Sequence, residues 1–273
     1  MASRAVIQNK KHPIITDFRK LSSLNGRLTA SRFVVEGFTL VNRAVHDKLP
    51  VDKILYTPDL LANDLGVAVL NNAVAANLAP FMLSSGLMGT ITSTRPVPAV
   101  VASVWMNYRN VSSLHLPSES TLLIADSITN PDNLGMVLRT AEAAAVECVV
   151  FIGEGANPYH KNCVRAARGA VGRISLAFCE SPEDYFAELI SAGFEILGAT
   201  AKANKSLYDL KLCTPVAIVV GNENEGIRRE ILQRCTNLVK IPMAPGQSSL
   251  NVAVAAGIIL FEHARRRQLQ AIN

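Results

Sequence analysis

The chain has 273 residues, of which 49% are hydrophobic and 18% charged, and its net charge is +5. This length suits one large domain or two modest ones, and this composition excludes a largely disordered chain. No apolar run is long enough to span a bilayer and no secretory leader is recognisable, so we expect no membrane partner.

Short strand and helix patterns alternate through the first half of the chain. β-rich runs at 32–37, 53–57, 80–83 and 99–106 predict strands, and helical spacing over 38–48 predicts a helix after the first of them. Together they predict a small α/β domain at residues 1–110. We also expect a helix to open at Pro58 and Asp59 with Leu60, Leu61, Leu65 and Val69 as its apolar stripe, and we expect Leu21, Leu24 and Phe33 to be packing residues.

A polar stretch at 107–120 is interpreted as the linker to a second domain at residues 118–273. Six runs in this domain are apolar throughout and alternate with helical patterns, which predicts a parallel sheet covered by helices on both faces. The predicted strands are 121–125, 148–152, 174–178, 194–197, 217–220 and 238–241, and the predicted helices are 134–145, 161–170, 182–192, 227–235 and a last helix from about Ser249.

Positive charge is concentrated in the first half. Residues 1–117 carry 12 Lys/Arg and 6 Asp/Glu, a balance of +6, whereas residues 118–273 carry 15 and 16, a balance of −1. A basic front half favours contact with a polyanion, although a solvated basic surface would give the same counts. Seven Lys/Arg among the first 32 residues are interpreted as a basic arm on a folded domain, with an organellar transit segment as the alternative, and the expected location is the cytoplasm.

Five scattered cysteines and five scattered histidines argue against a disulfide framework and against a metal site. No two cysteines form a C-x-x-C pair, and no histidines form H-E-x-x-H. We therefore expect a reducing compartment and no metal.

Three predicted strands of the second domain end in polar, glycine-bearing loops, and ligands of open α/β sheets bind at such carboxyl ends. In the first loop, Asn133 is expected to cap the following helix, and Arg139 lies about one and a half turns further on. The planar guanidinium of Arg139 suits a phosphate. An ordinary capped helix with a surface arginine fits these residues equally well.

The second loop, GNENEG at 221–226, has two glycines that free the backbone, and Glu223 can accept hydrogen bonds from loop amides or from a substrate hydroxyl. The dinucleotide and P-loop fingerprints are both absent. In the third loop, Ser248 and Ser249 are expected to cap the last helix, with Asn251 in its first turn near the same cleft. A plain turn and a plain helix cap are the alternatives at these two loops.

The order and spacing of the three loops are more specific than any one of them. NPDNLGMVLRTAEA, VVGNENEGI and IPMAPGQSSLNVAVAAGIILFE resemble the signature motifs of the SpoU/TrmH family of RNA ribose methyltransferases, in the SPOUT class, and the resemblance covers residues 121–265. VRAARGA at 164–170 matches a further family segment, and HPIITDFRKL with RFVVEG resembles the family's L30e-like RNA-binding domain. The chain departs from the family at Ala144 and Ala145, where Phe-Gly is usual, and at Ala167, where serine is frequent.

This resemblance implies an α/β domain with a deep C-terminal trefoil knot, S-adenosylmethionine as cofactor, and a homodimer with each site near the subunit interface. By motif position, the cofactor would contact Gly221, Ile241 and Leu250, with Thr200 and Met243 nearby. The residues expected to act on the substrate side are Arg139, Asn133, Glu223, Ser249 and Asn251.

The predicted reaction is transfer of a methyl group to a ribose 2′-hydroxyl of a structured RNA. Ribosomal RNA is the first choice, because family members with an L30e-like domain mostly act there, and transfer RNA is the second. Arg139 would hold the adjacent phosphate and stabilise the developing alkoxide, while Glu223, Ser249 and Asn251 would order the cleft and orient the hydroxyl.

Two other classes of protein compete with this interpretation. One is a non-catalytic RNA-binding protein that kept the fold, and the other is a nucleotide-dependent oxidoreductase, which would need the absent glycine fingerprint. We also expect a homodimer built partly on the last helix, because its apolar residues cover an arc wide enough to be buried on more than one side, with full burial within one chain as the alternative. These residues are Val252, Val254, Ala255, Ile258, Ile259 and Phe261.

Overall fold

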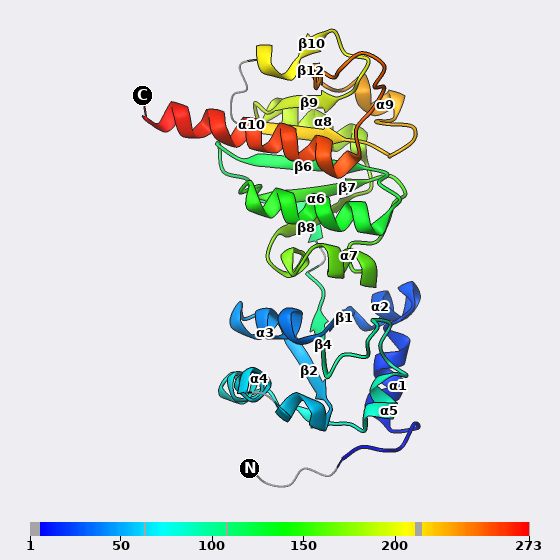
Figure 1. Ribbon diagram of the computed structural model, residues 1–273. Coiled ribbons are helices and arrows are strands. Elements are labelled where there is room, and N and C mark those ends of the chain that lie inside the picture. The colour runs from blue at the N-terminus through cyan, green and yellow to red at the C-terminus, as the bar shows by residue number, and fades with distance from the viewer. Residues whose placement is uncertain (1–5, 63, 108, 211–214, 273) are drawn as a thin grey trace. The chain divides into compact units, whose positions relative to one another are not determined.

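A computed structural model describes residues 6–62, 64–107, 109–210 and 215–272 of the chain (Figure 1). The chain forms two compact units, the first comprising residues up to Met106 together with Tyr159–Arg173, and the second comprising Asn107–Pro158 and Ile174–Asn273. The membership of 159–173 in the first unit differs from the predicted domain boundary. Contacts inside that unit explain it: the Phe33 and Tyr159 rings lie 4.9 Å apart, and Arg173 Nη1 lies 2.7 Å from Asp47 Oδ2.

The first unit is built on a four-stranded sheet in the order β1-β4-β2-β3. β4 pairs antiparallel with β1 and β2, and β3 pairs parallel with β2, so the four predicted strands are confirmed. The strands are β1 (Arg32–Glu36), β2 (Val51–Tyr56), β3 (Phe81–Met82) and β4 (Val100–Trp105). The helices are α1 (Pro13–Lys20), α2 (Leu24–Ala30), α3 (Phe38–His46), α4 (Asp64–Ala75), α5 (Ser85–Met88) and α7 (Lys161–Ala166), with short 3-10 turns η1 (Pro58–Ala62) and η3 (Ala170–Gly172).

Helices α1 and α2 are absent from the sequence prediction because they are too short to show a clear period. Local signals nevertheless start them: the His12 side chain accepts from the Ile14 amide, and the Ser23 hydroxyl accepts from the Gly26 amide. Leu21 and Phe33 are buried as expected. The expectation for Leu24 is wrong, because its side chain at the start of α2 is 50% exposed.

The helix predicted from Pro58 is wrong in extent. A 3-10 turn, η1, comes first and the α-helix α4 starts separately at Asp64. Because η1 and α4 are separate elements, the four residues of the predicted apolar stripe do not share one buried face. Leu60 and Val69 are buried, whereas Leu61 and Leu65 are 42% and 66% exposed.

The second unit holds an eight-stranded sheet in the order β10-β12-β9-β11-β6-β7-β8-β5, and every pairing in it is parallel. The six predicted strands and the parallel α/β class are therefore confirmed. The strands are β5 (Arg109–Asn110), β6 (Thr121–Asp126), β7 (Cys148–Ile152), β8 (Ser175–Cys179), β9 (Glu195–Ala199), β10 (Lys205–Ser206), β11 (Val216–Val220) and β12 (Asn237–Lys240). The helices are α6 (Pro131–Ala143), α8 (Pro182–Ser191), α9 (Arg229–Leu232) and α10 (Val252–Ile272), with 3-10 turns η2 (Val111–Ser113) and η4 (Leu207–Asp209).

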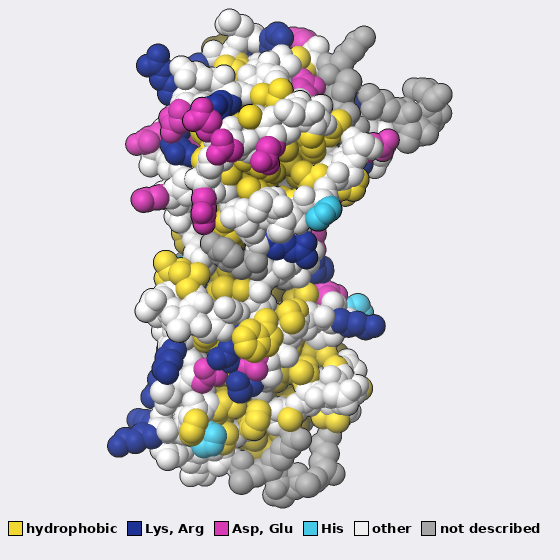
Figure 2. Space-filling model, turned by 180° about the vertical axis from the view of Figure 1, so that it is seen from behind, with side chains coloured by type: hydrophobic (Ala, Val, Ile, Leu, Met, Phe, Trp, Pro, Cys, Tyr) yellow, Lys and Arg dark blue, Asp and Glu magenta, His cyan; other side chains and the backbone are white. Residues whose placement is uncertain are grey.

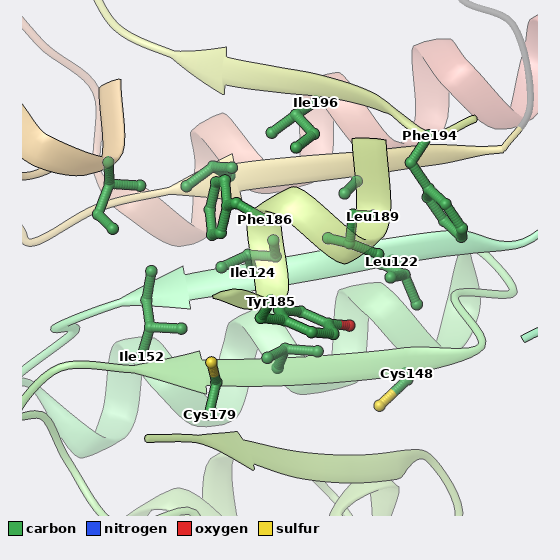
Figure 3. Close-up of a cluster of buried hydrophobic side chains, with 14 of the residues drawn as sticks. Leu122, Ile124, Cys148, Ile152, Cys179, Tyr185, Phe186, Leu189, Phe194 and Ile196 are labelled. Atoms are coloured by element: carbon green, nitrogen blue, oxygen red, sulfur yellow. The ribbon is translucent and has the colours of Figure 1, made fainter. Parts of the chain in front are cut away.

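Helices cover both faces of this sheet, which is why its strands are apolar throughout. On one face, α8 places Tyr185, Phe186 and Leu189 over Leu122 and Ile124 of β6 (Figure 3). On the other face lie α6 and α10 (Figure 3). Fully burying one such aliphatic or aromatic side chain stabilises the fold by about 1.5–3 kcal/mol, so this double-sided core fixes the sheet on which the loops described below stand.

Several predicted boundaries shift in the structure. The stretch interpreted as a linker contains β5, which pairs with β8, and the turn η2. The helix predicted at 161–170 ends at Ala166, and the one predicted at 227–235 shortens to the four residues of α9. The last helix starts at Val252, three residues later than predicted.

Buried thiols account for most of the cysteines. Cys148, Cys163 and Cys179 are buried and Cys235 is half-buried, and none of these four forms a disulfide bond with another, while Cys213 lies outside the described residues. Burial raises the pKa of Cys148 and of Cys179 to about 11, so neither is a thiolate at neutral pH. In the described ranges, no helix is long and apolar enough to cross a membrane.

Candidate active site

A cavity of about 290 Å³ lies in the second unit at the carboxyl ends of β9, β11 and β12. Its walls come from three chain segments, 199–202, 220–226 and 239–255. All five residues predicted to contact a cofactor line this one cavity: Thr200, Gly221, Ile241, Met243 and Leu250. Glu223 and Ser249, predicted for the substrate side, line it as well.

The loop after β11 is a tight turn closed by its own backbone. Asn222 and Gly226 exchange two amide–carbonyl hydrogen bonds of 2.9 and 3.0 Å, and the Asn222 carboxamide oxygen accepts from the amides of Asn224 and Glu225. Gly226 has φ +75°, and a Cβ on Gly221 would lie 2.2 Å from the Gly226 carbonyl carbon. Both glycines are therefore required by the turn itself.

Glu223 joins this turn to the loop after β6. Its Oε1 accepts from the Asn130 amide and from Asn133 Nδ2, both at 3.0 Å, and its Oε2 accepts from the Thr129 amide at 3.1 Å and the Thr129 hydroxyl at 3.2 Å. A carboxylate that accepts four bonds from one neighbouring loop fixes that loop strongly. Partial burial alone would raise the pKa of Glu223, but the hydrogen bonds from Asn133, Thr129 and Asn130 outweigh it and hold the pKa below its ordinary value.

Asn133 and Asn251 extend the same network to the last helix. Asn251 Nδ2 donates to Asn133 Oδ1 at 2.9 Å, so Glu223, Asn133 and Asn251 form one chain of hydrogen bonds. The predicted caps are wrong in detail. Asn130, rather than Asn133, caps α6, and Asn251, rather than Ser248 or Ser249, caps α10 by accepting from the Ala253 amide.

Asp126 and Arg228 form a buried ion pair at the end of β6, and neither is among the site residues predicted from the sequence. Asp126, with 0% of its surface exposed, accepts from Arg228 Nε at 2.6 Å and from the Arg228 amide at 2.8 Å. It ties the end of β6 to the segment that follows the GNENEG turn. The position of Asp126 at the end of a wholly apolar strand could have predicted such a pair, because a buried carboxylate requires a hydrogen-bonding or charged partner.

Arg139 and Ser249 occupy different surroundings. Ser249 is exposed and lines the cavity. Arg139 lies on the exposed side of α6, is not among the cavity-lining residues, and has no hydrogen bond or ion pair to the described part of the chain. Its guanidinium is therefore available to a molecule from outside.

The cavity suits a ligand with both apolar and polar parts. Val220, Ile241 and Leu250 provide apolar wall, whereas Thr200, Lys202 and Ser249 provide polar groups. Its volume is at the lower end of small-molecule sites, which run from about 300 to 1,000 Å³. These residues fit S-adenosylmethionine, which joins an adenine and a methionine chain through a ribose.

Comparison with protein families finds two matches that together cover most of the chain. Residues 120–261 match the SpoU rRNA Methylase family, and residues 12–102 match the MRM3-like substrate binding domain.

Individual relatives differ in how much of the chain they match. A 23S rRNA (guanosine-2′-O-)-methyltransferase, RlmB, from Photobacterium profundum is 38% identical over 60% of this chain and 67% of its own length. Two further RlmB relatives, from Vibrio parahaemolyticus and Vibrio vulnificus, are matched over 59% of their length. An uncharacterised tRNA/rRNA methyltransferase from Synechocystis is 25% identical over 98% of this chain and 96% of its own.

Solved structures match both units at once. The AdoMet-bound rRNA methyltransferase from Sinorhizobium meliloti is 27% identical with a TM-score of 0.83, covering 96% of this chain and 98% of that one. A protein described as an RNA 2′-O ribose methyltransferase is 27% identical with a TM-score of 0.80, covering 97% and 100%.

Proposed function

The chain belongs to the SpoU rRNA methylase family, and we propose that it transfers a methyl group from S-adenosylmethionine to a ribose 2′-hydroxyl of RNA. The observation that carries this proposal is the single cavity lined by Thr200, Gly221, Ile241, Met243 and Leu250, to which the Glu223 network is attached. S-adenosylmethionine, when bound there, supplies a sulfonium methyl group as the electrophile. An intact cavity favours this function over that of an RNA-binding protein that lost catalysis, and the missing glycine fingerprint disfavours an oxidoreductase.

The chain's own residues do three things in this reaction. Glu223, Asn133 and Asn251 hold the loops after β6 and β11 and the start of α10 in one arrangement, so that donor and acceptor meet in a fixed geometry. Ser249 orients the attacking hydroxyl from the cavity wall. Arg139 grips the phosphate beside the target ribose and stabilises the oxygen as its proton passes to solvent water. The new oxygen–carbon bond would form as the carbon–sulfur bond of S-adenosylmethionine breaks, with S-adenosylhomocysteine as the leaving group.

Ribosomal RNA is the proposed substrate, and transfer RNA is the second candidate. The names of the RlmB relatives and of the Sinorhizobium meliloti rRNA methyltransferase support the first. The first half of the chain, with its balance of +6, is proposed to bind the RNA. On the face shown in Figure 2, most Asp and Glu side chains lie over the unit that contains β6–β12. A cytoplasmic location and the C-terminal trefoil knot are further parts of the proposal. So are an RNA-binding domain at residues 1–110 and a methyltransferase domain at 118–273, with 159–173 belonging to the first compact unit.

A homodimer through α10 is also proposed. Val252 and Ile259 face the chain's own core at 7% and 0% exposure, whereas Val254 and Phe261 are each 51% exposed. Val254 and Phe261 are seven residues apart and therefore share one side of the helix. The neighbouring helix α6, against which α10 packs, adds a further exposed apolar side chain, Met136. A second subunit would bury the apolar side of α10.

Titration calorimetry with S-adenosylmethionine tests the proposed site. We expect the wild-type chain to bind it and NAD to give no heat. Gly221→Ala should abolish binding, because a Cβ there would lie 2.2 Å from backbone and force the turn open, whereas Gly86→Ala, where a Cβ meets no atom within 4 Å, should bind normally. Equal binding by both variants would show that the ligand does not use this turn.

A further inference from the structure

A second cavity, of about 160 Å³, lies within the first unit and shares no residue with the site described above. Segments from α1, α2, β1 and residues 90–93 surround it, together with Tyr159 and Lys161. Phe18, Leu21 and Tyr159 are only 1–2% exposed, and with Ile91 they make part of its wall apolar. A pocket that sets these apolar side chains beside several polar and charged ones suits a flat organic group with polar edges better than a bare ion.

Arg27 lines this cavity in an unusual state. It is 4% exposed, and its Nη1 donates to the carbonyls of Leu21 and Ser22 at 3.3 and 3.2 Å. Its Nε is buried without an acceptor, and among the described residues no carboxylate pairs with it. Burial lowers the pKa of Arg27, and no neighbouring acid acts against this effect. A buried guanidinium with unused donors is costly, so a ligand that brings acceptors would be stabilised there.

The carboxylate in the cavity wall argues against a phosphate as that ligand. Glu36 lines the cavity, and it accepts hydrogen bonds from the amides of Ser93 and Thr94 at 2.9–3.2 Å, which fix the adjoining loop. Glu36 therefore does not form an ion pair with Arg27. Its charge would repel an anion placed among these groups. Arg19 and Lys161 also line the cavity, and they would attract the backbone of a nucleic acid toward it.

We propose that this cavity takes one unstacked nucleobase of the RNA, guanine in preference to the other three, with the base packed on the apolar wall and its O6 and N7 facing Arg27. The identity of the macromolecule rests on the proposed function. Arginine matches the adjacent O6 and N7 acceptors of guanine with two donors, and proteins read RNA mainly through bases splayed out of single strands and bulges. Adenine presents a donor where guanine presents O6, so it matches Arg27 less well.

The test is binding of short single-stranded RNAs to the full chain without S-adenosylmethionine. The probes are uridine hexamers, unsubstituted or with one central guanosine, adenosine or cytidine, measured by fluorescence anisotropy. We expect the guanosine hexamer to bind about tenfold more tightly than the others. Arg27→Lys keeps the charge but loses the planar set of guanidinium donors, and it should reduce the preference for guanosine below about twofold. The control Lys48→Met removes an exposed charge outside the cavity and should leave that preference unchanged. Equal affinity for all four hexamers, or a preference for adenosine, would overturn the proposal.

Methyl NMR keeps the test independent of how well Arg27→Lys folds. In the wild-type chain, the guanosine hexamer should shift the Ile91 methyl signal, because Ile91 lines the cavity, and should leave that of Ile54, a core residue outside it, in place. An unmoved Ile91 signal at saturation would refute the site. Failure of the proposed methyl transfer is a separate result, since transfer of a labelled methyl group from S-adenosylmethionine to RNA is assayed on the same protein preparation.

Discussion

Glu223→Gln tests whether the carboxylate network holds the loop after β6 against the turn after β11. The substitution turns one carboxylate oxygen into an amide donor that faces either the Thr129 pair of donors or the Asn130 and Asn133 pair, so two of four bonds are lost. A hydrogen bond to a charged group contributes about 1.5–3 kcal/mol net when buried, and Glu223 is half-buried. We therefore expect the loop after β6 to open more easily by about 1–3 kcal/mol in total.

Hydrogen exchange at the Thr129 and Asn130 amides measures this opening directly, because Glu223 is their acceptor. A change of about 1–3 kcal/mol corresponds to exchange faster by roughly 5–150-fold. Glu225→Gln is the matched control, since Glu225 stands in the same turn and its side chain is exposed. Unchanged exchange in Glu223→Gln, or an equal effect in Glu225→Gln, would refute the role assigned to the network.

The same variant has a predicted pH dependence. Because the pKa of Glu223 lies below its ordinary value of 4.5 in the folded chain, its stabilising contribution is complete above that value and is lost as the pH falls through the lowered pKa. The difference in melting temperature between wild type and Glu223→Gln should therefore be constant from about pH 7 to about pH 5.5 and shrink below pH 4.5. A difference that grows on acidification would contradict this sign.

Three further predictions concern substrate, RNA affinity and assembly. Arg139→Ala should reduce methyl transfer by about 100-fold or more while the dissociation constant for S-adenosylmethionine, measured by calorimetry, changes less than about twofold, and an active variant would remove Arg139 from the mechanism. Replacing the exposed Lys10, Lys11 and Lys20 by Gln should weaken RNA binding and lower the salt slope by about 0.7–0.9 for each phosphate that is no longer neutralised, and an unchanged slope would exclude these lysines from the interface. Sedimentation equilibrium should give twice the 29.4 kDa monomer mass for wild type and the monomer mass for Phe261→Asp, whereas a monomeric wild type at micromolar concentration would refute the dimer.

The parallel sheet could be predicted from the sequence because its strands are apolar on both faces. Val216–Val220, buried at every position, is the clearest of them. The candidate cavity could be predicted through the resemblance, since motif positions far apart in the chain, such as Thr200 and Leu250, line one cavity. Periodicity alone could not have brought them together, because a strand order in which β12 lies between β9 and β10 is a long-range property.

The shortest helices, and side-chain contacts between residues far apart in the sequence, could not be predicted. Helices α1 and α2 are eight and seven residues long, so two turns of pattern do not separate them from a loop. Asp126 and Arg228 are 102 residues apart in the sequence, and no local pattern in either segment identifies the other residue as its partner. Residues 159–173 belong to the first unit through contacts such as that of Phe33 with Tyr159. The local sequence around either residue does not predict this long-range contact.

Transfer of a labelled methyl group is the decisive experiment on the proposed reaction. The full chain is incubated with S-adenosylmethionine labelled in its methyl group and with ribosomal RNA lacking 2′-O-methyl groups, and the RNA is then digested to nucleosides and separated by mass. We predict label in one 2′-O-methylated nucleoside, and less of it by about 100-fold or more when Arg139→Ala replaces the wild type. Label on a base, or no label in ribosomal or transfer RNA from a chain that binds S-adenosylmethionine, would contradict the proposed function.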